Sequence, residues 1–213
     1  MDFCFYLITD RRATAPGMEI LDVLASAFEA GVKGVLLREK DMPDDELFGL
    51  AGRVRDLSRR YRARFLVSGR VDVALSVDAD GVHIPSTGIP VHEARALIGD
   101  EKYLAVSTHS LQEALDAQEG GADFITFGPV YHTPSKAVYG PPAGLDALAD
   151  VCKGIKIPVF ALGGVKNNNV ADTLKAGAYG AAVISAVMGS PDPAKAAREI
   201  MDIIRDYKLR RLI

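Results

Sequence analysis

One pattern recurs four times along the chain: the end of an amphipathic helix, a turn of small residues, and a short apolar strand. The repeats read EAGVKGVLL, SVDADGVHI, EGGADFITF and KAGAYGAAV, and they end at Leu37, Ile84, Phe127 and Val183. Glycine suits such turns because the backbone that follows a helix often takes a positive φ. The strands are apolar at nearly every position, which is typical of parallel strands covered on both faces. The repeat therefore predicts strand–helix units built around a buried parallel sheet.

Further strands are predicted near Phe3–Ile8, Arg64–Val67, Lys102–Val106 and Ile157–Ala161, with helical patterns between the strands. The last helix is expected to begin at Asp192 as N-cap and Pro193 as first residue. About eight such units, with no Pro- or Ser-rich linker, predict a single (β/α)8 TIM barrel domain over residues 1–213. A doubly wound open sheet is the alternative, although its first turn, here ITDRRATAPG, usually carries a G-x-G-x-x-G motif.

Composition narrows the classes of partner. The 213 residues carry a net charge of only −3, whereas nucleic acid binding requires a dense basic face. No stretch approaches the ~18 apolar residues of a membrane span, and Asp2 interrupts the short apolar N-terminus, so no signal peptide is expected. Two cysteines are too few for a disulfide framework or a zinc site. We expect a cytoplasmic protein with no nucleic acid partner and no membrane partner.

The segment PVFALGGVKNNN stops an apolar strand on two glycines, Gly163 and Gly164. Counted along the chain, this is the exit of the seventh strand, and Ile184 and Ser185 follow the eighth. Phosphate sites of such barrels commonly lie at these two loops. Glycines let phosphate oxygens approach backbone N–H groups, and the start of a helix favours an anion. The sequence predicts a phosphate site here; the alternative is that the glycines only permit a tight turn.

Two further segments are expected at the same end of the barrel. The loop GPVYHTPSKAVYGPPAG, residues 128–144, offers Thr133 and Ser135 as hydroxyl donors and Lys136 as a point charge. The segment LLREKD offers a basic pair after the second strand.

In that basic pair, Arg38 and Lys40 are two residues apart and should point to the same side. Glu39 should point the other way, into packing or an ion pair.

The ordered segments YLITD, LLREK, VSTHSLQEA, ADFITFGPVYHTPSK, ALGGV and AVISAVM span the whole chain. Together they resemble the thiamine-phosphate synthase and TenI family of small (β/α)8 barrels. The resemblance implies a small phosphorylated heterocycle as ligand. The synthase joins a thiazole phosphate to a pyrimidine pyrophosphate with loss of pyrophosphate, whereas the TenI-type tautomerase aromatises a carboxythiazole phosphate.

The resemblance also assigns residues. Those that match positions holding the thiazole phosphate are Thr133, Ser135, Gly164, Ile184 and Ser185. Lys136 matches a lysine of the same segment, and those that match positions holding the pyrimidine pyrophosphate are Arg38, Lys40 and Ser107.

The chain departs from the synthase pattern at its two Mg²⁺ carboxylates. Ser68 and Gly69 stand at the Asn-Asp pair after the third strand, and Gly88 stands at the second aspartate. Asp72 is nearby but is interpreted as the cap of the next helix. SGRVDVAL and IPS look instead like the TenI branch, whose catalytic histidine position is Pro129 here.

The preferred interpretation is therefore a TenI-like tautomerase that works by proton transfer without a metal. His132 is the candidate acid–base residue, with Lys136 as a second candidate that serves better as an anchor; His83 is interpreted as structural. The alternatives are a thiamine-phosphate synthase, in which case Mg²⁺ is expected, and a non-catalytic ligand-binding homologue. A homodimer is a further expectation.

Overall fold

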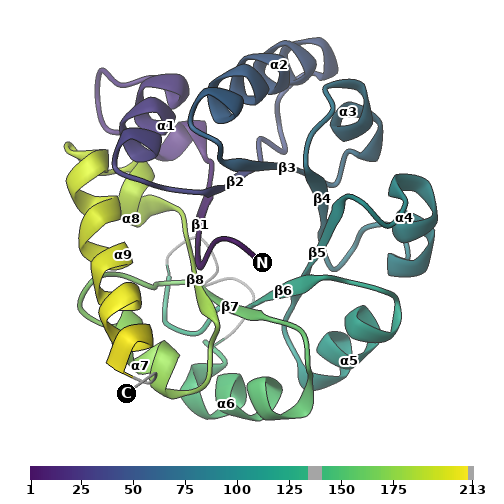
Figure 1. Ribbon diagram of the computed structural model, residues 1–213, viewed down its shortest axis with the longest axis vertical. Helices are drawn as coiled ribbons and strands as arrows, with labels where there is room; N and C mark the ends of the chain where they lie inside the picture. Colours follow the sequence, from purple (N-terminus) through teal and green to yellow (C-terminus); the bar gives the residue numbers. More distant parts are fainter. Residues whose placement is uncertain (134–140, 211–213) are drawn as a thin grey trace.

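The computed structural model describes residues 1–133 and 141–210, and in it eight parallel strands close into a barrel (Figure 1). The strands are β1 (Phe5–Ile8), β2 (Gly34–Leu37), β3 (Arg64–Ser68), β4 (Gly81–Ile84), β5 (Tyr103–Thr108), β6 (Phe124–Phe127), β7 (Val159–Leu162) and β8 (Gly180–Val183). Each strand pairs with the next, and β8 pairs with β1 through Leu7 opposite Val183. The predicted TIM barrel is confirmed, and the open-sheet alternative is wrong.

The helices form an outer ring around the strands (Figure 1). They are η1 (Arg11–Ala13), α1 (Ile20–Glu29), α2 (Asp44–Arg60), α3 (Val71–Ser76), α4 (Val91–Ile98), α5 (Leu111–Glu119), α6 (Gly144–Gly154), α7 (Val170–Lys175), α8 (Ser185–Met188) and α9 (Pro193–Arg210). The predicted start of the last helix is confirmed, because the Lys195 N–H donates to the Asp192 carboxylate at 2.9 Å. Among the described residues, no helix is both long and apolar enough to cross a bilayer.

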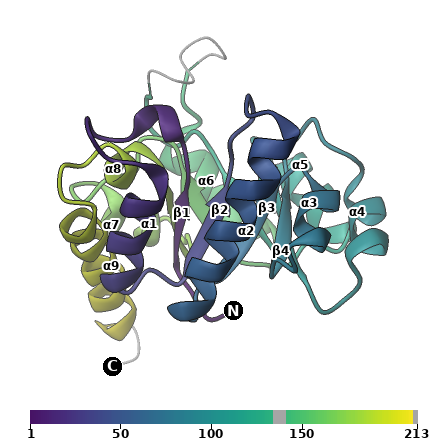
Figure 2. The ribbon, with the colours of Figure 1, turned by 90° about the horizontal axis from the view of Figure 1, so that it is seen from above.

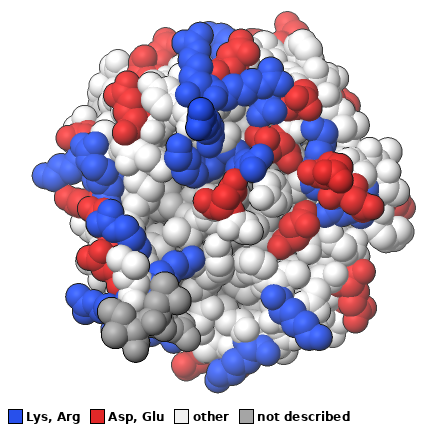
Figure 3. All heavy atoms as spheres, viewed as in Figure 1, with Lys and Arg blue, Asp and Glu red and all other residues white. Residues whose placement is uncertain are grey.

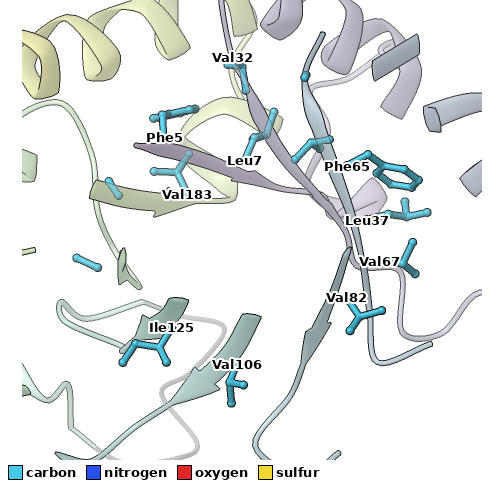
Figure 4. Close-up of a cluster of buried hydrophobic side chains, with 14 of the residues drawn as sticks. Phe5, Leu7, Val32, Leu37, Phe65, Val67, Val82, Val106, Ile125 and Val183 are labelled. Atoms are coloured by element: carbon cyan, nitrogen blue, oxygen red, sulfur yellow. The ribbon is translucent and has the colours of Figure 1, made fainter. Parts of the chain in front are cut away.

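Two apolar layers hold the barrel together, and they use alternate residues of every strand. One set points outward to the helices, as Figure 4 shows for Leu7, Leu37, Val67 and Val82 on successive strands. The other set fills the interior, where Tyr6, Ile8, Leu36, Leu66, Phe124 and Phe160 belong to one cluster. Because both faces are buried, the strands are apolar at most positions, which explains the apolar runs of the repeats.

Phe3 closes the amino end of this interior. The first strand was predicted to begin at Phe3, but the chain bends at Cys4 and β1 begins at Phe5. The bend turns the Phe3 ring across the barrel, where its centroid lies 5.6–5.7 Å from those of Tyr6, Phe124 and Phe160. Tertiary packing therefore overrides the strand tendency of this residue.

The amino end of the barrel carries a group of basic residues. The N-terminus and the end of α9 lie at the amino end (Figure 2), and Figure 3 looks onto that end, with basic residues gathered over the C-terminal part of α2. Many of these charges are paired: Arg59 and Lys102 with Asp78, at 2.9 and 3.0 Å, and Arg55 with Asp80 at 2.6 Å.

Candidate functional site

The carboxyl ends of the strands converge on the mouth of the barrel, where polar side chains replace the apolar interior. Leu36 belongs to the interior cluster, and Arg38, two residues further along, continues on the same side of the chain. The same alternation on β4, β5 and β6 turns His83, Ser107 and Thr126 toward the barrel axis, and hydrogen bonds join them. Strand register thus brings together residues that are far apart in sequence.

His83 is the centre of a buried hydrogen-bonded cluster. Its Nε2 lies 2.9 Å from the Ser107 Oγ and 3.5 Å from the Thr126 Oγ1, while its Nδ1 lies 3.3 Å from the Tyr6 hydroxyl. Burial, and then the positive charge of Arg38, lowers the pKa of His83 to about 3. The imidazole is therefore neutral near pH 7, with one donor and one acceptor nitrogen.

The cluster keeps its hydrogen bonds in either tautomer of the imidazole. Burial raises the pKa of Tyr6 well above its usual value, so the phenol keeps its proton. Because the Tyr6 and Ser107 hydroxyls can each donate or accept, both ring nitrogens have a partner whichever of them carries the proton. His83 thus points inward from the end of β4 and is buried with a partner at each ring nitrogen, as its interpretation as a structural residue requires.

Arg38 supplies a positive charge beside this cluster. It is half-buried, and no hydrogen bond or ion pair joins its guanidinium to any residue that the structure describes. Only its backbone N–H is bound, to the Thr9 Oγ1 at 2.9 Å. A half-buried cation without a partner among the described residues suits an anionic ligand. Lys40 follows in the exposed turn after β2.

Gly163 and Gly164, at the exit of β7, have left-handed backbones with φ of +93° and +67°. A Cβ on Gly163 would lie 2.5 Å from the Cα of Pro129, and one on Gly164 would lie 2.8 Å from the Tyr131 Cβ. The positive φ values and the close packing against the loop after β6 are what the alternative of a tight turn requires, and the phosphate site stays a prediction. Within the described residues, neither glycine N–H donates a hydrogen bond.

Ile184 and Ser185 occupy the neighbouring loop, because β8 pairs with β7. Ile184 precedes α8, and Ser185 is exposed at its start. Thr133 is half-buried and His132 is exposed, and the His132 carbonyl reaches the site from the loop after β6. Ser135 and Lys136 lie outside the described residues, so their predicted roles stay predictions.

The residues at the positions where the synthase pattern has its magnesium carboxylates do not fit a Mg²⁺ ion. Ser68 ends β3, and Gly69, with φ of +70°, follows it. Asp72 is not the helix cap that was expected: it lies in the first turn of α3, and its carboxylate is bound by Arg70 at 2.7 Å. Searching residues 1–133 and 141–210 finds no group of three or more His, Cys, Asp and Glu side chains that could hold a metal.

A groove of about 710 Å³ lies beside the mouth, between the loop after β1 and the first turns of α2. Its lining comes from η1, α1, α2 and the adjoining loops: Arg11, Thr14, Met18, Glu19, Ile20, Met42, Glu46, Gly49, Leu50 and Arg53. Its rim mixes cations and anions, and it contains none of the predicted site residues. We place the candidate site at the mouth, where Arg38, His83 and the Gly163–Gly164 backbone lie at the same end of the barrel.

Comparison with known proteins identifies the family of the chain. Residues 5–187 match the TMP-TENI family model, described as thiamine monophosphate synthase. A relative from Geobacter sulfurreducens is 50% identical over 204 residues, which cover 96% of this chain and 95% of that protein. A protein named thiamine-phosphate synthase from Roseiflexus sp. is 40% identical over 199 residues, covering 93% of this chain and 84% of the relative.

A solved structure is similar as well. Thiamine phosphate pyrophosphorylase from Pyrococcus furiosus superposes with a TM-score of 0.87 at 37% identity, and the match covers 96% of each chain.

Proposed function

The chain belongs to the thiamine-phosphate synthase family, and from that membership we propose that it joins a thiazole phosphate to a pyrimidine pyrophosphate with release of pyrophosphate. The names of relatives at about 40% identity favour this coupling over the tautomerisation that the sequence favoured. The reaction is a transfer between two phosphorylated heterocycles.

One observation carries the proposal: the mouth has two separate sets of groups suited to anions. The first is the half-buried backbone of Gly163 and Gly164, with Ser185 at the start of α8. The second is the guanidinium of Arg38, which acts on His83 across the mouth. A tautomerase needs one phosphate site, whereas coupling needs a phosphate site and a pyrophosphate site.

In this reaction, the residues of the mouth would hold the two substrates separately. The Gly163–Gly164 backbone, Thr133, Ile184 and Ser185 hold the thiazole phosphate, to which Ser135 and Lys136 are assigned by resemblance. Arg38 and Lys40 meet the charge that develops on the departing pyrophosphate, which lowers the barrier to its release. Neutral His83 and Ser107 bind and orient the pyrimidine rather than transfer protons.

A second function, thiazole tautomerisation, is favoured by Ser68, Gly69 and Gly88 at the positions of the synthase carboxylates. In that case His132 moves the proton, with Lys136 as anchor. His132→Ala should then lower the tautomerisation rate by about 10²- to 10⁴-fold, the usual contribution of a general acid–base group. Under the coupling proposal the same variant keeps its rate.

Two parallel assays separate these functions. In one, the protein receives both coupling substrates, with Mg²⁺ or with EDTA, and pyrophosphate and thiamine phosphate are measured. In the other, it receives the non-aromatic carboxythiazole phosphate alone, and formation of the aromatic product is followed.

Pyrophosphate release with thiamine phosphate formation supports coupling, and we expect it to persist in EDTA. Aromatisation without coupling supports the tautomerase. Binding of thiazole phosphate with neither reaction supports a non-catalytic homologue. The expected homodimer stays a prediction, which light scattering on the 22.8 kDa chain would test.

A further inference from the structure

A buried carboxylate lies directly behind the cation of the mouth. Glu39 follows Arg38 in the chain and is only 5% exposed. A buried carboxylate is costly unless charges and hydrogen bonds compensate it. The hydrogen-bond partners of the Glu39 carboxylate therefore indicate what it does in the fold.

Glu39 holds two loops of the mouth together. Its Oε2 accepts from the Arg11 backbone N–H and from the Arg11 Nη1, both at 3.1 Å, so the carboxylate binds the segment that follows β1. The Arg11 guanidinium also binds Asp41 at 2.8 Å, and Arg12 binds the same carboxylate. The loops after β1 and β2 thus form one charged network.

Thr9 connects this network to Arg38. The Thr9 hydroxyl donates to the Glu39 Oε1 at 2.7 Å, and the same hydroxyl oxygen accepts from the Arg38 N–H at 2.9 Å. Because the proton points at Glu39, a lone pair of the hydroxyl is left for Arg38. The backbone N–H of Thr9 donates to the Leu36 carbonyl at 2.9 Å, which keeps Thr9 in register with β2.

We propose that Glu39 and Thr9 are positioning residues, which act through the backbone of Arg38 to aim its guanidinium at the pyrophosphate of the substrate. The inference rests on the proposed function, because it takes Arg38 as the pyrophosphate ligand. Arg38 has no side-chain partner among the described residues, so the direction of its guanidinium depends on its own backbone. That backbone is held by the relay, the chain of hydrogen bonds from Glu39 through the Thr9 hydroxyl to the Arg38 N–H. The alternation of the chain places the relay on one side and the cation on the other.

The test compares two substitutions of Thr9. Thr9→Val keeps the shape and removes the relay, whereas Thr9→Ser keeps the hydroxyl. We measure the Kd of inorganic pyrophosphate and of the thiazole phosphate by calorimetry, together with the melting temperature. Thr9→Val should raise the Kd for pyrophosphate about tenfold, the effect of one misaligned charge-assisted hydrogen bond. The Kd for thiazole phosphate should stay the same, and Thr9→Ser should restore pyrophosphate binding.

Thr173→Val is the matched control, since Thr173 is equally buried and bonds the Val170 carbonyl at 2.7 Å within α7. It should lower the melting temperature without changing either Kd. Glu39→Gln, which keeps the size of the side chain, should act in the same direction as Thr9→Val. The proposal would be overturned if Thr9→Val weakened the binding of pyrophosphate and of thiazole phosphate equally. It would also be overturned if Thr9→Ser did not restore pyrophosphate binding.

The proposed function is judged separately, by turnover. If the wild-type protein binds pyrophosphate with the expected dependence on Thr9 but forms no thiamine phosphate, the coupling reaction fails and the positioning role is upheld. Absence of pyrophosphate binding by the wild-type protein would overturn the positioning role itself.

Discussion

At the scale of single residues, the mouth combines a cation without a partner among the described residues and a histidine that cannot hold a proton near neutral pH. Arg38 and His83 lie close enough for the charge of the first to lower the pKa of the second. Both the guanidinium without a described partner and the lowered histidine pKa result from burial at the end of a closed barrel. The first should affect anion binding, and the second should affect stability in acid.

Replacing Arg38 by Gln should weaken binding of inorganic pyrophosphate by roughly ten- to a hundredfold, because a charge-assisted hydrogen bond is lost. The melting temperature should stay unchanged, since the guanidinium bonds no described residue. Calorimetry and thermal melts provide both readings. Arg60→Gln, in the last turn of α2, is the control and should leave binding intact. Unchanged affinity in the Arg38 variant would contradict the assignment.

His83 should make the protein less stable in acid. Its pKa is lowered to about 3 in the folded state, below the ~6.5 of an unfolded histidine. The unfolded chain therefore binds the extra proton first, and the contribution of the neutral ring is lost as pH falls from about 6.5 toward 3. The slope reaches at most about 1.4 kcal/mol per pH unit for one proton.

Urea unfolding at pH 7 and pH 5 measures this effect. His83→Gln should lose less stability between the two values than the wild-type protein does. His92→Gln, on the exposed side of α4, should behave like the wild type. An equal loss of stability in the wild type and in His83→Gln would exclude His83 as the source of the pH dependence.

At the scale of elements, glycine has opposite effects in a helix and at a strand exit. Gly52 lies inside α2, where a Cβ would meet only open space, whereas Gly164 has φ of +67° and a close neighbour in Tyr131. The first glycine weakens its helix, and the second is required by the packing of two loops.

Gly52→Ala should therefore raise the free energy of unfolding by about 0.5–1 kcal/mol, the difference in helix propensity. Gly164→Ala should lower it by about 1–3 kcal/mol, because the backbone is left-handed and the methyl group meets Tyr131. Denaturant titrations of the two variants give both values. If Gly164→Ala were as stable as the wild type, the loop after β6 would have to shift away from the added methyl group at little cost.

Element boundaries could be predicted because their causes are local. The predicted strand ends Leu37, Ile84, Phe127 and Val183 agree with the structure, since each apolar run stops at polar or loop-forming residues within a few positions. The contact of Gly163 with Pro129 could not be predicted in this way. It depends on the pairing of β6 with β7, whose residues are more than 30 positions apart.

At the scale of the whole molecule, closure of the barrel leaves an open amino end that a single aromatic ring fills. Phe3 is 5% exposed and packs against Tyr6, Phe124 and Phe160 from three strands. It also lies against Gly34, where a Cβ would come within 2.5 Å of its ring. The segment before β1 is therefore part of the core.

Phe3→Ala should destabilise the fold by about 3–5 kcal/mol, as removal of a buried phenylalanine usually does. Phe3→Leu should recover more than half of that loss, because it refills much of the volume. Urea unfolding provides the comparison. A loss below about 1 kcal/mol in Phe3→Ala would show that the amino end collapses around the gap.

The sequence alone determined the barrel, most strand positions, the last helix and the direction of Glu39, because hydrophobic period, glycine turns and side-chain alternation are properties of neighbouring residues. It also placed Arg38 and Gly164 at one end, since parallel strands share a direction. Only the tertiary structure decided that His83 lies between Tyr6 and Ser107, that Phe3 leaves its strand, and that Thr9 links Glu39 to Arg38. Those contacts depend on the register and closure of eight strands, which no local pattern encodes.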